Sequence, residues 1–125
     1  MTVLLDSDVL VDYLRGRPAA GRYVDGLAVT PTCSEVTRVE VLRGMRSHER
    51  RVTERFLATI RWVGVNQEIS TRAGDLGRRF RRSHGTLGVA DLVIAATSEQ
   101  LGFPLATLNV RHFPMFPGLE PAYRR

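Results

Sequence analysis

The chain has 125 residues, of which 43% are hydrophobic and 25% are charged. These are ordinary values for a globular protein, so they exclude a disordered chain and predict a single domain over residues 1–125. No apolar run approaches the roughly 18 residues that cross a bilayer, and the single cysteine, Cys33, cannot form an internal disulfide. The N-terminus also reaches Asp6 before a signal-peptide core could form, so these features exclude a membrane role and predict a cytoplasmic protein.

The net charge is +5, and all 18 basic residues are arginine. Arginine binds phosphate with two parallel hydrogen bonds and stacks on bases, so the charge is compatible with nucleic acid. GC-rich codon usage would also replace lysine with arginine across an ordinary solvated surface. Composition alone therefore leaves both interpretations open.

The expected elements begin with a short apolar run, Val3–Leu5, that is typical of a buried strand. Asp8 is expected to cap a helix that ends at Gly16, and Pro18 to start a second short helix. Strands and helices then alternate, which predicts an α/β fold with a central, mostly parallel sheet flanked by helices. The later expected elements are strands at 27–33, 62–65 and 104–108, helices at 34–45, capped by Ser34, and at 47–60, 67–85 and 88–102, and a loop-like tail at 112–121.

Apolar residues at helical spacing predict which face of each helix is buried. In helix 34–45 the stripe is Val36, Val39 and Leu42 or Arg43, and in helix 47–60 it is Val52, Phe56 and Ile60. Helix 67–85 carries Ile69, Ala73, Leu76 and Phe80 on one side, and helix 88–102 is apolar nearly all round. The last helix is therefore expected to be buried.

Two acidic residues, Asp6 and Glu40, lie where a ligand site or the hydrophobic core is expected. Asp6 follows the first strand directly, and ligands of parallel α/β folds bind at the carboxyl ends of strands. One cap is sufficient for one helix, so Asp6 is free for another role if Asp8 is the cap. Glu40 shares a helix face with Val36, and its alternative role is a surface ion pair with Arg43 or Arg46. Gly44, one turn further on, indicates a close approach by another group.

Asp91 lies in the most hydrophobic helix, where a carboxylate is rarely buried without a partner. Stabilisation of the helix dipole from the first turn is the alternative explanation. Three acids without a zinc-type spacing of Cys or His suit a hard divalent cation such as Mg²⁺, or Mn²⁺ as a substitute. The three histidines, His48, His84 and His112, are expected at the surface.

The stretch VLLDSDVLV at residues 3–11 also fits the start of haloacid dehalogenase-like phosphatases, in which Asp-x-Asp follows an apolar strand. That resemblance implies a downstream lysine and a later acid pair for the metal. The chain has no lysine, and no such pair follows Asp12. The phosphatase interpretation is therefore excluded.

Three ordered motifs over nearly the whole chain resemble the PIN-domain ribonucleases, in particular the VapC toxins of toxin–antitoxin pairs. The opening LLDSDVLVDYLRG matches through Asp6 and Ser7, and TRVEVLRG matches through Glu40 and Gly44. The third motif, VADLVIAATSEQLGFPLATLNVRHF, matches through Asp91 and ends in a Thr-x-Asn segment before Phe113. The family often carries a fourth acid just before that phenylalanine, where this chain has His112.

The resemblance implies a PIN-like three-layer fold and a metal-dependent endoribonuclease in which Asp6, Glu40 and Asp91 are both catalytic residues and metal ligands. Ser7 and Asn109 would assist, and the arginines expected to hold RNA phosphates are Arg15, Arg43 and the run Arg78, Arg79, Arg81 and Arg82. The implied partners are RNA, a VapB-like antitoxin and a second copy of the chain in a homodimer. The alternative is a PIN-like module that binds RNA or antitoxin without turnover, because the fourth acid is missing.

Overall fold

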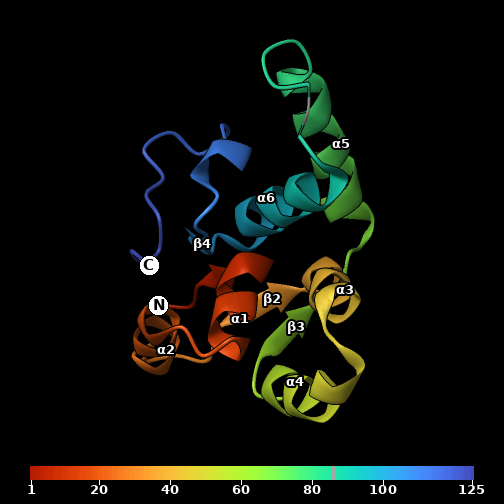
Figure 1. Ribbon diagram of the computed structural model, residues 1–125. Helices are drawn as coiled ribbons and strands as arrows, with labels where there is room; N and C mark the ends of the chain where they lie inside the picture. Colours follow the sequence, from red (N-terminus) through yellow and green to blue (C-terminus); the bar gives the residue numbers. More distant parts are fainter. Residues whose placement is uncertain (86) are drawn as a thin grey trace.

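The computed structural model describes residues 1–85 and 87–125, and four short strands form one sheet at its centre (Figure 1). The strand order is β3-β2-β1-β4, and every strand pair is parallel. The predicted parallel α/β architecture is therefore confirmed. The strands are β1 (Leu4–Leu5), β2 (Thr32–Ser34), β3 (Arg61–Val63) and β4 (Leu105–Ala106).

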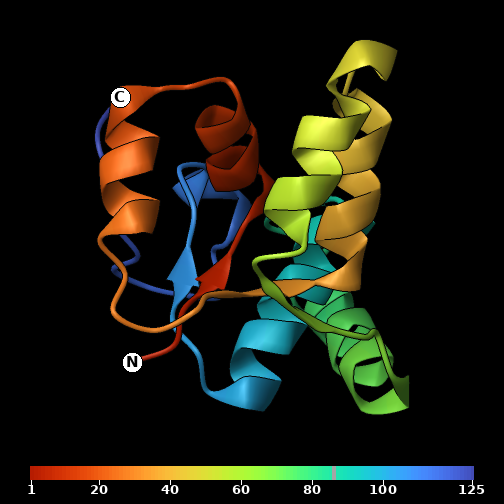
Figure 2. The same cartoon turned by 90° about the horizontal axis from the view of Figure 1, so that it is seen from below.

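Helices cover both faces of the sheet, which gives the three layers expected of a PIN-like fold (Figures 1 and 2). Leu4 packs with α5, α6 and the tail in one core, and Leu5 packs with α1, α3 and α4 in the other. Neighbouring residues of β1 thus serve opposite layers, because side chains alternate across a strand. The helices are α1 (Ser7–Leu14), α2 (Pro18–Asp25), α3 (Glu35–Gly44), α4 (Arg50–Leu57), α5 (Gln67–Phe80) and α6 (Val89–Leu101), with 3-10 turns η1 (Ser47–Glu49) and η2 (Val110–His112).

Several predicted element boundaries are confirmed and others are wrong. The helix predicted over 47–60 is instead η1 followed by α4, which ends at Leu57. Ser34 caps α3 as predicted, and Gly16 takes the positive φ that favours glycine after α1. The second strand begins at Thr32 rather than at residue 27, because Pro31 lacks the N–H that would continue the ladder. The helix predicted over 67–85 ends at Phe80, before the arginine pair at 81–82.

The buried faces of α3 and α4 differ from the predicted stripes. Val39 and Val52 are each 61% exposed, whereas Thr37 and Thr53 are buried. Both helices pack through a face that carries a threonine, whose methyl group is apolar although the residue does not count in a hydrophobic pattern. The stripe of α5 is confirmed for Ile69, Ala73 and Leu76, and α6 is buried from Val93 to Ser98.

The tail after η2 forms part of the core, although its sequence is loop-like. Phe113 is 1% exposed and packs in the same cluster as Leu4 and Met115. We expect Phe113→Ala to lower the free energy of unfolding by about 3–5 kcal/mol, because a large buried ring leaves a cavity. Urea denaturation would measure this, with Val89→Ala, at a residue 77% exposed, as the control. Equal midpoints for the two variants would contradict a core role for the tail.

Asp12 is an acid for which the sequence indicated no role. It is 2% exposed, and it binds Tyr123, Arg125 and Arg17. Burial alone would raise the pKa of Asp12, but the hydrogen bonds from Arg125 and Tyr123 and the two guanidinium charges hold that pKa below its usual value. Asp12 therefore stays ionised and fastens the C-terminal end of the chain to α1.

Among the described helices, none is both long and apolar enough to cross a membrane.

Candidate active site

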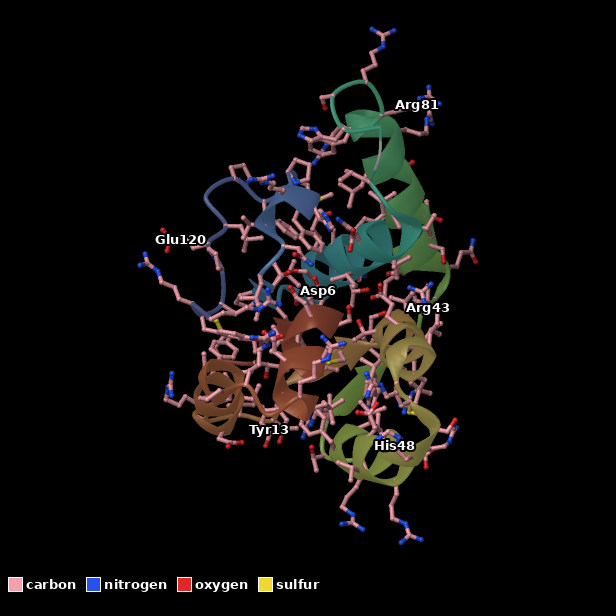
Figure 3. All side chains as sticks on the ribbon, in the orientation of Figure 1. Asp6, Tyr13, Arg43, His48, Arg81 and Glu120 are labelled. Atoms are coloured by element: carbon pink, nitrogen blue, oxygen red, sulfur yellow. The ribbon has the colours of Figure 1, made fainter. Side chains whose placement is uncertain are left out.

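Asp6 stands at the carboxyl end of β1 and caps α1, near the centre of the molecule (Figure 3). Its Oδ1 accepts from the Ser7 N–H at 2.8 Å, and its Oδ2 accepts from the Thr107 hydroxyl at 2.7 Å. The side chain is nearly inaccessible, and burial, with a further contribution from the neighbouring Asp8 charge, raises the pKa of Asp6 to about 7. The predicted position of Asp6 at a strand end is confirmed, but Asp6 rather than Asp8 is the helix cap.

Asp8 is the functional candidate that the sequence reasoning missed. It lies in the first turn of α1, where its Oδ2 accepts from the Leu108 N–H at 2.8 Å and its Oδ1 from the Val9 N–H at 2.8 Å. Burial raises the pKa of Asp8, and these hydrogen bonds work against the rise. The Asp-x-Asp spacing was the available signal, but the assumption that Asp8 is a helix cap hid it.

Glu40 projects from α3 toward the same acids. Its Oε1 is buried and has no hydrogen-bond partner among the described residues. Burial raises the pKa of Glu40, the Asp91 and Asp8 charges add to the rise, and the Ser7 hydroxyl and Arg43 partly offset it. A buried, partner-free carboxylate oxygen is costly unless a cation or a proton reaches it.

The two alternatives raised by the Glu40 motif are not supported. Within the described part of the chain, Glu40 forms no ion pair with Arg43 or Arg46. The close approach predicted at Gly44 is wrong for the chain itself, because a Cβ added there would meet nothing within 4 Å. Glu40 therefore faces the other acids rather than a surface arginine.

Asp91 lies in the first turn of α6, and its side chain is 21% exposed. Its Oδ2 is 3.1 Å from Nδ1 of His112, the residue at the position of the family's fourth acid. Burial raises the pKa of Asp91, whereas the adjacent His112 lowers it and the Asp8 charge raises it further. His112 is exposed at the surface as predicted, but it also contacts this acid.

These side chains form an acid cluster, which we define as Asp6, Asp8, Glu40 and Asp91. The Asp8 charge raises the pKa of the other three members, and the Asp91 charge raises the pKa of Asp6 and Glu40, so the structure brings the three predicted acids together and adds a fourth. In residues 1–85 and 87–125, no three His, Cys, Asp or Glu side chains are already gathered closely enough to hold one ion. The carboxylates of the acid cluster are nevertheless the oxygen ligands that suit a hard divalent cation.

We expect Asp8→Asn to lower the affinity for Mn²⁺ by about 10- to 100-fold, because it removes one charge from the donor set or from the groups around it. The amide oxygen of asparagine can still accept from the Leu108 N–H, so the loop after β4 should keep its place. Isothermal titration of Mn²⁺ would measure the affinity. The control is Asp75→Asn, at an exposed residue of α5. If neither variant changes the Mn²⁺ affinity, Asp8 is excluded from the site.

The predicted auxiliary residues lie beside the acid cluster in different ways. The backbone N–H of Ser7 binds Asp6 and its hydroxyl faces Glu40, whereas Asn109 is linked through its backbone N–H to the Thr107 hydroxyl at 3.0 Å. Arg43, in the last turn of α3, is close enough to lower the pKa of Glu40.

The other predicted RNA-binding arginines are exposed, but their distances from the acid cluster differ. Arg15 follows α1 and lines a separate hollow with Gly44 and Met45. Arg78 and Arg82 lie at the end of α5, which packs beside the start of α6, since a Cβ on Gly77 would be 3.0 Å from Leu92. Figure 3 shows the neighbouring Arg81 at the far tip of this end of the molecule.

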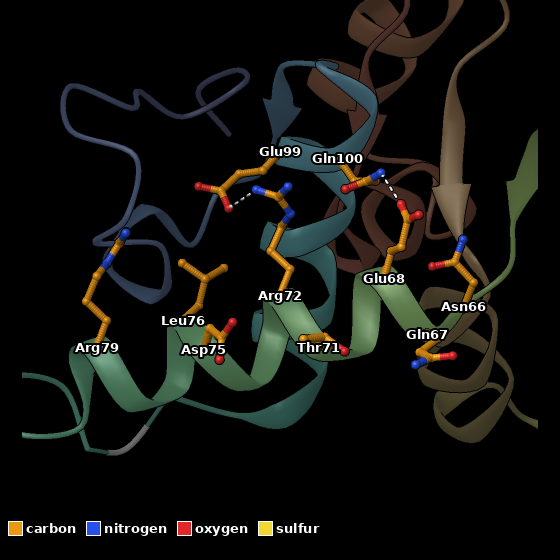
Figure 4. Close-up of a pocket in the computed structure, with 10 residues that line it drawn as sticks. All are labelled: Asn66, Gln67, Glu68, Thr71, Arg72, Asp75, Leu76, Arg79, Glu99 and Gln100. Atoms are coloured by element: carbon orange, nitrogen blue, oxygen red, sulfur yellow. Dashed lines mark hydrogen bonds and ion pairs between the residues drawn. The ribbon is translucent and has the colours of Figure 1, made fainter.

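A large open hollow of about 1060 Å³ lies along α5 and the C-terminal part of α6, as Figure 4 shows. Gln100 donates to Glu68 at 2.6 Å, and Arg72 is 3.6 Å from Glu99. No member of the acid cluster lines this hollow. The hollow is a solvated groove between α5 and α6, and polar pairs join the two helices across it. The acid cluster therefore remains the better candidate for the active site.

Comparison with known proteins agrees with this fold and site. The family model of the PIN domain matches residues 3–115, and the chain therefore belongs to the PIN-domain family. Its relatives include two VapC proteins of Mycobacterium tuberculosis. Ribonuclease VapC10 is 46% identical, with 97% of this chain and 92% of that protein covered, and ribonuclease VapC19 is 41% identical, with 96% and 98% covered.

A solved toxin–antitoxin complex from Klebsiella pneumoniae contains a similar chain, with a TM-score of 0.85 and 26% identity over 98% of this chain and 99% of that one. The predicted resemblance to VapC proteins and the predicted PIN-like fold are thus confirmed. PIN-domain nucleases of this group generally depend on a divalent metal ion.

Proposed function

We propose that the protein is the toxin of a type II toxin–antitoxin pair and acts as a metal-dependent endoribonuclease that hydrolyses RNA phosphodiester bonds. The observation that carries this proposal is the acid cluster at the carboxyl end of β1, in a chain 46% identical to a ribonuclease over nearly its full length. The arginine-rich surface suits the same substrate, because guanidinium groups bind phosphate. The alternative of a binding module without turnover is not favoured by relatives that are named ribonucleases.

We further propose that Asp6, Glu40 and Asp91 hold Mg²⁺, for which Mn²⁺ can substitute. When bound, such an ion activates water and neutralises charge that develops on the phosphate. Oε1 of Glu40, buried and partner-free, would accept a proton from the attacking water. Asp6 would be fixed for its role by the Ser7 N–H and the Thr107 hydroxyl.

The proposed partner is a VapB-like antitoxin, since the Klebsiella neighbour was solved as a toxin–antitoxin complex. We propose that this chain forms a homodimer within a heteromeric complex of that kind, and that residues 1–125 act as one domain in the cytoplasm. Co-expression with a candidate VapB-like antitoxin, followed by light scattering of the purified complex, would give the stoichiometry.

The function is tested by mapping the 5′ ends of total RNA after incubation with purified, antitoxin-free protein and Mg²⁺ or Mn²⁺. Discrete cuts are expected, and they should be absent in EDTA and with the Asp6→Ala variant. The matched control is Asp75→Asn, an exposed acid outside the acid cluster, which should cut at the same places. RNA that is bound but not cut by folded protein would overturn the nuclease and favour the binding module.

A further inference from the structure

The C-terminal end of the chain is held by a tail clamp, which we define as Asp12, Arg17, Tyr123 and Arg125. The Tyr123 hydroxyl donates to Oδ2 of Asp12 at 2.8 Å, and Arg125 donates to both Asp12 oxygens at 3.0 and 3.3 Å. Both ribbon views place the C-terminal end beside α2 (Figures 1 and 2), and Tyr123 packs against Tyr23 of that helix. Charge-assisted bonds to a buried carboxylate are stronger than surface ion pairs.

The tail clamp is adjacent to a contact that leads to the acid cluster. The N–H of Ala122, next to Tyr123, donates to the Thr107 carbonyl at 2.9 Å. The hydroxyl of Thr107 in turn donates to Asp6 and accepts from the Asn109 N–H. One residue, fully buried, thus binds the tail through its backbone and Asp6 through its side chain.

The tail adds to the contacts on either side of Thr107, where the Ala106 carbonyl accepts from the Asp6 N–H and the Leu108 N–H donates to Asp8. β4 ends at Ala106, so the ladder with β1 stops one residue before Thr107. Beyond that point its carbonyl is fixed by Ala122 of the tail. The rotamer that aims the hydroxyl at Asp6 depends on the backbone orientation of Thr107.

We propose that the tail clamp is a positioning device for the active site, in which Tyr123 and Arg125 hold Ala122 against Thr107 and so fix the orientation of the Asp6 carboxylate. This role rests on the function proposed above for Asp6. It assigns to the last residues of the chain a part in the reaction although they lie outside the acid cluster. The simpler alternative is that the tail clamp only anchors the terminus.

The test compares the double variant Tyr123→Phe/Arg125→Ala with Arg124→Ala, an exposed neighbour outside the tail clamp. Asp12 is left unchanged, because a buried substitution could prevent folding. Two measurements need no RNA: the amide NMR signals of Ser7 and Asn109, and the affinity for Mn²⁺ by electron paramagnetic resonance. We expect both amide signals to shift and the Mn²⁺ dissociation constant to rise about tenfold in the double variant, as for other residues that orient ligands.

With an RNA oligonucleotide that carries a mapped cleavage site, kcat should fall about tenfold in the double variant while KM stays unchanged. The proposal would be overturned if the tail is released, seen as unstructured amide signals for residues 119–125, while the Ser7 and Asn109 amide signals and the Mn²⁺ affinity stay unchanged. Equal effects in Arg124→Ala would also overturn it. If no RNA is cut by the parent protein, the nuclease fails, yet the amide and Mn²⁺ measurements still decide whether the tail clamp positions Asp6.

Discussion

The Asp6→Asn variant is expected to melt about 5 °C above the parent protein at pH 8 and to cleave no RNA. In the folded protein the pKa of Asp6 is raised from 3.8 to about 7, chiefly by burial. The folded state therefore holds the Asp6 proton more tightly than the unfolded state between about pH 4 and 7, and the parent loses stability as the pH rises through that window. At pH 8 the ionised carboxylate costs on the order of 4 kcal/mol, of which asparagine should recover a part.

The measurement is a series of thermal melts at pH 5, 6, 7 and 8 for the parent, Asp6→Asn and the exposed control Asp75→Asn. The difference between Asp6→Asn and the parent should be small at pH 5 and largest at pH 8. The control should stay within about 0.5 kcal/mol of the parent at every pH, because surface substitutions have small effects. A constant difference across the series would show that the Asp6 charge does not oppose folding. Residual cleavage by Asp6→Asn would remove Asp6 from the catalytic set.

Addition of Mg²⁺ or Mn²⁺ at pH 8 is expected to raise the melting temperature. With the ion at 100 times its dissociation constant, the free energy of unfolding should increase by about 2.7 kcal/mol. The negative charges of the acid cluster repel one another, and a bound cation removes that repulsion. The effect should vanish near pH 5, where the raised pKa of Asp6 keeps it protonated. EDTA should reverse the gain.

Calorimetric titration in two buffers of different ionisation enthalpy would also count the protons released when the metal binds. Proton release is expected at pH 6–7 and should decrease in the Asp6→Asn variant. Glu40→Gln should weaken the metal without changing the fold, since its buried oxygen has no partner to lose. The metal site would be excluded if stabilisation by Mg²⁺ were the same at pH 5 as at pH 8, or the same in Asp6→Asn as in the parent.

The sequence predicted the layers of the fold well, because alternating strands and helices leave few arrangements for a parallel sheet. It failed where a polar residue supplies apolar packing, as with Thr37 and Thr53, and where a loop-like segment fills the core, as with Phe113. Hydrophobic periodicity is blind to both situations, since the first hides a methyl group and the second has no period.

The three acids predicted from motifs are brought together, but two further contacts depend on residues about a hundred positions apart. The local pattern predicts Asp8 as a helix cap and contains no sign of its bond to the Leu108 N–H. Asp12 likewise meets its partners only when the C-terminal end folds back. Long-range hydrogen bonds of this kind follow from the tertiary fold, so local sequence signals do not contain them.

The bond between Thr107 and Asp6 joins residues 101 positions apart. During synthesis on a ribosome, the first helix and its acids emerge early, whereas the hydroxyl that orients Asp6 emerges only after β4 has been made. Long-range contacts of this kind form late in folding, after the loop between them has closed. A nascent or truncated chain would thus carry all four acids by residue 91 and still lack the group that aims one of them.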